Sequence, residues 1–466
     1  MTSFPPWLNT MLTAVGVPAV RISRAKALAR AKALADRDAN CDAFPFFARA
    51  ARAGLPEACY RLGRCYLLGL GVPPSVGEAL RWMGRAAEAG EVAAQTQLGA
   101  LALQGVQLGA LAPRGVQPGA LAPRGVTGRG GYGLFDRAGL WDGGSAEPDY
   151  DSAEYWCRRA IAAGSVEAKA LLAFILTDGP ADRRDQAAGD RLYREAAEAG
   201  WSRGQLGLAT ILLRQGGQNG AEQAMPLLRS AAADGVAVAH HLLGMLAESG
   251  AAGTVDFEAA AASYKDAACL GYAPAQVRYG FALMHGRGIA CDLFTAETWL
   301  RRAALAGDAQ AAAVVGSLYI RTGGLPANHA EAAVWLRRAA EGGHAGAARV
   351  LGRLLLLGSG VPLDIADAAH WLRVAGDGGE AAARADMVRL ALTGLVGEDD
   401  RRAVVEWLRA DALAGDAAAQ YDLGLCLTQG IGAAPDWMAG LAWVRRAAEG
   451  GHPAAAEMLG ELADPV

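Results

Sequence analysis

The sequence predicts an all-α solenoid of about ten helix-turn-helix repeats, each 36 residues long. Two residue types that recur at fixed positions of the repeat predict this fold. Tryptophans recur every 36 residues in the second half of the chain, and a glycine follows each after eight residues: Trp299, Trp335, Trp371, Trp407 and Trp443, with Gly307, Gly343, Gly379, Gly415 and Gly451. A period of this length is typical of arrays in which each repeat stacks on its neighbours.

Each period contains two helical segments. In residues 55–90, the first complete repeat, apolar and small residues recur at three and four positions on both sides of a Gly-Leu-Gly-Val-Pro turn at 69–73. Glycine and proline in that turn end the first helix. A further glycine column in the middle of the first helix predicts a backbone contact with no room for a Cβ atom: Gly63, Gly99, Gly244, Gly280, Gly316, Gly352 and Gly424.

We interpret the tryptophans as structural anchors, since a buried indole removes roughly 150–250 Å² from water. Three middle repeats carry Leu192, Leu227 and Ser263 instead, so we expect looser packing there. The structural set is Trp82, Trp156, Trp299, Trp335, Trp371, Trp407 and Trp443.

Five regions follow from the period. They are an N-terminal leader helix region, the first repeats, a Gly/Pro-rich insertion, the main array and a C-terminal capping helix: 1–42, 43–104, 105–149, 150–451 and 452–466. The leader is basic between 21 and 32 and either shields the end of the array or recruits the chain to a membrane surface. The insertion, which repeats ten residues in tandem, is predicted to be disordered. Alternatively it is a binding loop anchored by Tyr132, Phe135 and Trp141.

The repeated pattern resembles the Sel-one-like repeat, a relative of the tetratricopeptide repeat. The pattern is Ala-x-x-x-Leu-Gly, a Gly-x-Gly turn, and Ala-x-x-Trp-Leu-Arg-Arg-Ala-Ala-x-x-Gly, clearest at 275–307 and 311–343. The resemblance implies a right-handed α/α superhelix that acts as an adaptor, with no catalytic residues shared across the family. Val388, in the mid-helix glycine column, and Asp411, in an alanine column, depart from the pattern and put the regularity of the ninth repeat in doubt.

No motif predicts catalysis, a metal or a cofactor. The seven histidines have no paired ligand spacing, and neither a phosphate-binding Gly-Lys loop nor a Gly-x-Ser-x-Gly motif occurs. A hydrolase acting on cell-wall-related small molecules, like a β-lactamase, remains an alternative because relatives show such activity. Those relatives carry paired cysteines within repeats, whereas the seven cysteines here are scattered and predicted to be buried free thiols.

The charge and hydropathy of the sequence limit the classes of partner and the cellular compartment that we expect. The net charge of −4 favours neither nucleic acid nor an anionic membrane. Because no signal peptide or 18-residue apolar stretch occurs, we expect a cytoplasmic protein without stable membrane insertion. The predicted partner is a protein or peptide, and the pattern does not specify its identity or the oligomeric state.

The resemblance also implies which surface binds. First helices line the concave face of related arrays, and mapped onto this chain the candidate partner-binding residues are Phe281, Met284, Arg321, Arg349, Arg353, Arg389 and Tyr421. The arginines form a row that could clamp an acidic peptide or its terminal carboxylate. The alternative is that they are ordinary solvated surface cations.

Overall fold

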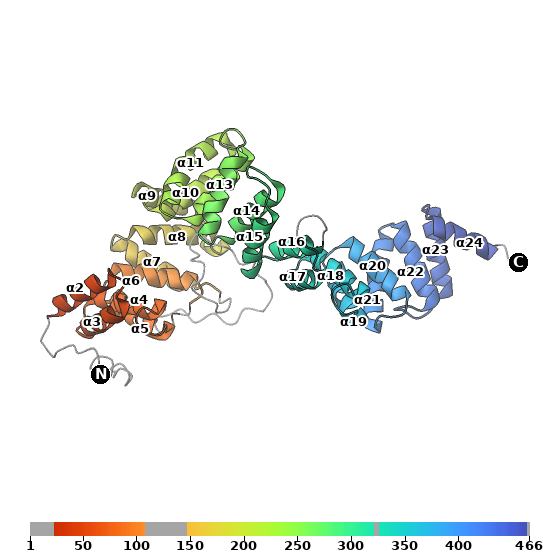
Figure 1. The fold of residues 1–466 in the computed structure, drawn as a ribbon, viewed down its shortest axis with the longest axis horizontal. Coiled ribbons are helices and arrows are strands. Elements are labelled where there is room, and N and C mark those ends of the chain that lie inside the picture. Colours follow the sequence, from red (N-terminus) through yellow and green to blue (C-terminus); the bar gives the residue numbers. More distant parts are fainter. Residues whose placement is uncertain (1–22, 107, 109–146, 321–325, 464–466) are drawn as a thin grey trace. The chain divides into compact units, whose positions relative to one another are not determined.

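The computed structural model describes residues 23–106, 108, 147–320 and 326–463 (Figure 1). Over these residues the chain consists of helices and turns without a β-strand, which confirms the predicted all-α repeat fold. The chain divides into two units, residues 1–256 and 257–466. Most of the predicted insertion, including Tyr132, Phe135 and Trp141, lies outside the described residues, so both interpretations of it stay predictions.

The first unit contains eleven described α-helices, and helices that are consecutive within it pack against each other. They are α2 (Arg24–Ala35), α3 (Asn40–Arg52), α4 (Pro56–Leu68), α5 (Val76–Glu88), α6 (Val92–Leu103), α7 (Tyr150–Ala162), α8 (Val166–Asp178), α9 (Gln186–Glu198), α10 (Ser202–Gln215), α11 (Gly217–Ala233) and α12 (Ala237–Ser249). Helices α6 and α7 form a hairpin although the insertion separates them, and the Asp149 amide donates to the Ala102 carbonyl at 2.9 Å.

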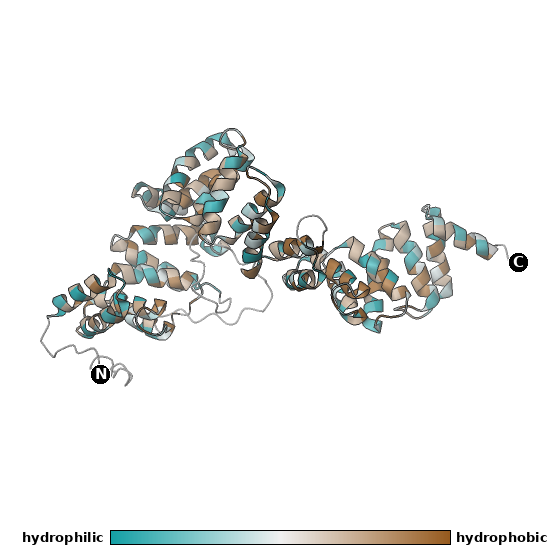
Figure 2. Cartoon of the chain, in the orientation of Figure 1, coloured by the Kyte–Doolittle hydropathy of each residue, from teal (hydrophilic) through white to brown (hydrophobic). Residues whose placement is uncertain are grey.

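The second unit continues the same alternation of helices over its described residues. They are α13 (Phe257–Cys269), α14 (Ala273–His285), α15 (Leu293–Leu305), α16 (Ala309–Ile320), α17 (His329–Glu341), α18 (Ala345–Leu357), α19 (Ile365–Asp377), α20 (Ala381–Leu392), α21 (Glu398–Leu413), α22 (Ala417–Gln429), α23 (Trp437–Glu449) and α24 (Pro453–Ala463). We call α14, α16, α18, α20, α22 and α24 the first helices of their repeats, and α15, α17, α19, α21 and α23 the second helices. Figure 2 shows hydrophobic and hydrophilic residues alternating around them, as amphipathic helices require.

Side-chain caps start the second helices α15, α17, α19 and α23, whereas the N-cap of α21 is Gly397, which has no side chain to accept a hydrogen bond. The Asp364 carboxylate accepts a hydrogen bond from the Asp367 amide at 3.0 Å, and the Asn328 side chain accepts one from the Glu331 amide at 3.1 Å. Such caps satisfy an amide that has no partner within the helix, and each typically stabilises a helix by about 1 kcal/mol. The same capping position recurs at Asp149, Asp185, Asp292 and Asp436.

The glycines in the middle of the first helices touch the second helix of the same repeat. A Cβ atom built on Gly352 would lie 2.8 Å from Cγ of Leu372, and one on Gly424 would lie 2.6 Å from a methyl group of Val444. The predicted close contact is therefore present. The side chain that touches each glycine belongs to the residue directly after the tryptophan. These residues are Met83, Cys157, Leu300, Leu336, Leu372 and Val444.

The tryptophans themselves lie beside this seam. Trp82, Trp156, Trp335 and Trp371 are buried, whereas Trp299, Trp407 and Trp443 are only partly buried. The residues that follow them are more deeply buried. In the repeats that lack tryptophan, Tyr193, Leu228 and Tyr264 occupy the same following position and are buried as well. The seam therefore stays filled in the middle repeats, where we expected looser packing.

Glycine recurs at two further positions of the repeat, and the reason that favours glycine differs between them. Gly343 ends α17 with φ +85° and has no neighbour near a hypothetical Cβ atom, so only its backbone conformation favours glycine. Gly360, in the turn after α18, has φ +73° and also abuts the start of α17 in the preceding repeat, where a Cβ atom would lie 2.7 Å from the Ala330 nitrogen. Gly71, Gly288 and Gly432 make the equivalent contact.

The ninth repeat departs from this geometry as its sequence suggests. Val388 replaces the mid-helix glycine of α20 and is 5% exposed. Helices α20 and α21 approach each other closely over a shorter stretch than the neighbouring hairpins do. Trp407 of α21 instead reaches back to Gly376 of α19, where a Cβ atom would lie 2.8 Å from the edge of the indole. The tryptophan of the ninth repeat thus packs closely on the preceding repeat, while the close approach within its own hairpin is short.

The two turn glycines give a matched test of these causes. We expect Gly343→Ala to lower the free energy of unfolding by about 1 kcal/mol, because alanine disfavours left-handed backbone. Gly360→Ala has the same conformational cost and in addition meets backbone atoms of α17, so we expect a further loss of about 1–3 kcal/mol. Urea unfolding followed by circular dichroism measures both. Equal losses would show that the contact with α17 contributes nothing.

Candidate functional site

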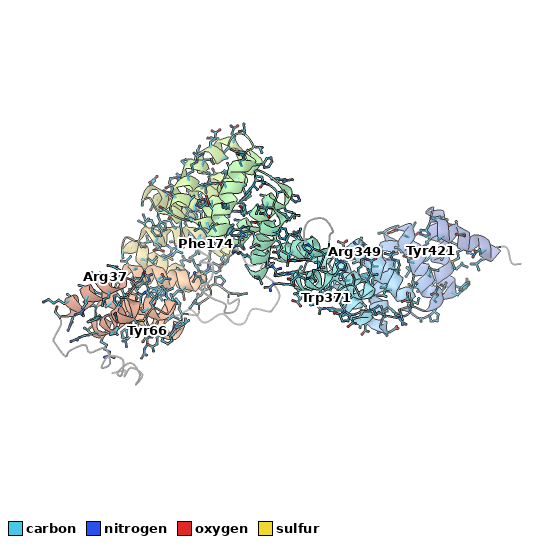
Figure 3. The ribbon with its side chains drawn as sticks, viewed as in Figure 1. Arg37, Tyr66, Phe174, Arg349, Trp371 and Tyr421 are labelled. Carbon is cyan, nitrogen blue, oxygen red and sulfur yellow. The ribbon has the colours of Figure 1, made fainter. Side chains whose placement is uncertain are left out.

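The partner-binding residues predicted from the sequence lie on first helices of the second unit. Phe281 and Met284 are on α14, and Arg349 and Arg353 on α18. The remaining two described members are Arg389 on α20 and Tyr421 on α22, and Figure 3 shows Arg349 and Tyr421 on their separate helices. Arg321 lies outside the described residues.

Two of the arginines share one carboxylate. The Arg349 Nε atom donates to Asp386 at 3.0 Å, and Arg389 forms an ion pair with the other oxygen of Asp386. The side chain of Asp386 is only 11% exposed, whereas that of Arg389 is 74% exposed. Asp386 therefore holds the Arg349 guanidinium in place between α18 and α20, and most of the Arg389 guanidinium stays in solvent.

Arg353 differs from its neighbours. It lies one turn after Arg349 on α18 and is exposed. Among the described residues no carboxylate forms an ion pair with it. A guanidinium without an internal partner keeps all five of its donors for solvent or a ligand. The Arg349, Asp386, Arg353 and Arg389 side chains, called here the arginine cluster, thus carry more positive than negative charge.

At the two ends of the row of candidate partner-binding residues, an aromatic ring stacks on a histidine ring. The Tyr421 ring stacks on the ring of His452, with centroids 4.7 Å apart, and His452 begins α24. The Phe281 ring stacks on His285, with centroids 6.2 Å apart. Phe281, Met284 and Tyr421 are all partly buried, so each offers one edge of its side chain at the surface. The structure does not bring these three together with the arginine cluster in a single pocket.

Asp422 follows Tyr421 and lies partly buried on α22. Burial raises the pKa of its carboxyl group above the ordinary value, and the nearby His452 opposes that shift. Keeping the Asp422 carboxylate ionised therefore lowers the free energy of unfolding. Burial also raises the pKa of the neighbouring Cys426 thiol to about 11, which makes that cysteine an unreactive packing residue.

The paired arginines after each tryptophan serve the framework. The first of the pair reaches the next repeat: Arg301 forms an ion pair with Glu331 at 3.1 Å and lies over the Trp335 ring at 5.0 Å. Arg337 and Asp367 repeat the ion pair at 2.8 Å. The second arginine lies over the tryptophan of its own helix, as seen for Arg85, Arg159, Arg302 and Arg446. Arg301 and Arg337 therefore join repeats together, and the second arginines pack on their own helices.

The basic residues of the leader also contact the protein. In α2, Ala27 and Ala31 are buried against the first repeats. Lys32 forms an ion pair with Glu57, and the Arg30 guanidinium lies 4.9 Å from the centroid of the Phe46 ring. These contacts pack α2 against α3 and tie it to α4. Whether α2 also touches a membrane remains a proposal.

Within the described residues, no group of three or more His, Cys, Asp and Glu side chains is placed to hold a metal ion. All seven cysteines are free. Cys59, Cys65, Cys157 and Cys426 are buried as predicted, while Cys41, Cys269 and Cys291 are exposed, so the prediction of buried thiols was wrong for these three. No described helix has the length and hydropathy needed to cross a membrane.

Stacked helix pairs with this seam define a helical repeat protein, and comparison with known proteins identifies the repeat. A family model described as the Sel1 repeat matches residues 56–91, 133–165, 273–308, 309–344, 345–380 and 417–452. The chain belongs to the Sel1 repeat family, whose members generally mediate protein–protein interactions and are generally non-enzymatic. The unmatched stretch 166–272 contains the second helices that lack the tryptophan.

Among solved structures similar to this chain, one supports the fold. A protective antigen present in uropathogenic Escherichia coli strains has a TM-score of 0.53 at 24% identity, covering 89% of this chain and 81% of its own. A Sel1 repeat protein from Oxalobacter formigenes is 26% identical over 55% of this chain and 86% of its own, with a TM-score of 0.34. No significant match was found among curated protein sequences.

Asp422→Asn tests the electrostatics of the Tyr421 region. The folded-state pKa of Asp422 is raised, so its contribution to stability is fully present below the unfolded-state pKa of about 4 and is lost as pH rises through the folded-state value. We therefore expect the variant to be more stable than the wild type at pH 7, with the difference shrinking as pH falls towards 4. Thermal unfolding across this pH range measures it. A difference that does not change with pH would contradict the assignment.

Proposed function

We propose that the chain is a non-enzymatic scaffold or adaptor that binds a protein or peptide partner along the first helices of its second unit, at the arginine cluster. The observation that carries the proposal is the excess of positive charge there. Arg353 is exposed without a carboxylate partner among the described residues, and Arg389 turns most of its guanidinium to solvent. Elsewhere on this unit, Arg301, Arg337 and Arg373, each two residues after a tryptophan, form ion pairs with the neighbouring repeat.

The partner that fits is an acidic segment or a chain-terminal carboxylate. A guanidinium binds a carboxylate through two parallel N–H donors, which gives both strength and orientation. Asp386 fixes Arg349 beside Arg353, so part of the ordering cost of a clamp is met before the partner arrives. Exposed ion pairs contribute only about 0–1 kcal/mol each, so the cluster orients a partner whose remaining affinity comes from other contacts along the row.

The alternative, that these arginines are only solvated surface cations, predicts a different result on substitution. We expect Arg349→Gln with Arg353→Gln to weaken binding of the partner at least tenfold, which corresponds to about 1.4 kcal/mol. Neutral glutamine is preferred over glutamate because a glutamate at 349 would face Asp386. Affinity purification with quantitative mass spectrometry measures which proteins remain bound to each form.

The matched control is Arg409→Gln with Arg445→Gln. It removes the same charge from exposed positions on the second helices α21 and α23. Proteins that are lost from the cluster variant and retained by the control support the proposal. Recovery of the same proteins at wild-type levels by the cluster variant would refute the cluster as the binding site, provided that circular dichroism shows both variants folded.

A further inference from the structure

The surface of the second unit changes sign between α18 and α24. We call the sixth and tenth residues after the glycine that precedes each first helix the first-helix face, since residues four apart point to the same side of a helix. On α18 they are Arg349 and Arg353, and on α24 they are Glu457 and Glu461. Both glutamates are exposed, and no cation in residues 326–463 forms an ion pair with them. The same two positions therefore carry opposite charges on the two helices.

The two first helices in between carry a cation and an apolar patch. Arg389, at the tenth position on α20, has a side chain that is 74% exposed. On α22, Tyr421 and Leu425 occupy the sixth and tenth positions and are partly exposed. The stack of Tyr421 on His452 fixes its ring beside α24. A guanidinium packs well on an aromatic or aliphatic side chain, so α20 and α22 are complementary to each other as well.

This order of side chains is complementary to itself under a twofold rotation. The four first helices run in the same direction, because one antiparallel helix separates each from the next. Rotation about an axis parallel to them, between α20 and α22, places α18 of one copy on α24 of another without a shift along the helices. Arg349 then faces Glu457, Arg353 faces Glu461, and each pair forms twice. Rotation about the perpendicular axis would place α18 on α18, where like charges repel.

We propose that the acidic segment bound by the arginine cluster is α24 of a second copy of this chain, so that two chains form a twofold dimer through their first-helix faces. The inference rests on the proposed function, because it names the partner of the same site. Ion pairs at an exposed surface are individually weak and are screened by salt, so the dimer is weak and salt-sensitive. It also competes with any other acidic segment for the guanidinium groups of the cluster.

Sedimentation equilibrium of the full chain measures this association. We expect a monomer–dimer equilibrium with a Kd on the order of 10 µM in about 50 mM salt, weakened at least tenfold in about 500 mM salt. Arg353→Glu and Glu461→Arg each place like charges opposite one another twice in the dimer. Each variant alone should therefore stay monomeric where the wild type dimerises. An equal mixture of the two variants restores all four ion pairs and should dimerise like the wild type.

The matched control is Arg409→Glu, which makes the same charge reversal at an exposed position on the second helix α21 and should dimerise like the wild type. A wild type that stays monomeric at about ten times the expected Kd would overturn the dimer, as would a dimer that persists in both charge-reversal variants or a mixture that fails to associate. Glu461→Arg leaves the arginine cluster intact, so it should retain any protein that is lost from the Arg349→Gln, Arg353→Gln chain. If such proteins are found while the wild type stays monomeric, the dimer is refuted and the proposed function stands.

Discussion

The close approach of two helices at a glycine is the constraint on which the rest of the array depends. Where Gly352 meets Leu372, the helices of one repeat can approach because the first helix has no Cβ atom at the contact. Glycine in a helix costs about 0.5–1 kcal/mol, and the buried leucine offsets this by roughly 1.5–3 kcal/mol of apolar burial. The seam sets the spacing within a repeat, and the turn glycines and arginine bridges then set the spacing between repeats.

The sequence predicted the period, the helix pairs and the close contact, because each depends on local pattern alone. It did not identify which side chain makes the contact. Trp371 and Leu372 are neighbours in sequence, and successive helical residues point about 100° apart, so the period cannot say which one faces the glycine. The more recognisable residue was taken as the anchor. Its ring lies beside the seam, where the arginine of the preceding repeat, Arg337, covers it.

The candidate site was predictable only in part, for a related reason. The row of first-helix arginines follows from the repeat register. The pairing of Arg349 with Asp386 does not, since the two residues lie 37 positions apart and meet only because α18 and α20 stack side by side. The pairing changes the chemistry, because an arginine already held by a carboxylate orients a ligand differently from one that is free in solvent. Val388 was the exception, since one branched residue in a glycine column was enough to foresee an altered hairpin.

The distribution of charge along a repeat separates framework from function. Three second-helix arginines, Arg301, Arg337 and Arg373, form ion pairs between repeats, and Arg301 also reaches Trp335 of the following second helix. Substituting such a residue changes stability and stacking before it changes recognition. First-helix positions six and ten residues after the repeat glycine vary more, from Arg349, which pairs with Asp386 of the next repeat, and the exposed Arg353 to Glu457 and Glu461. Variation at these positions leaves the glycine seam intact, so these side chains can change without a change of fold.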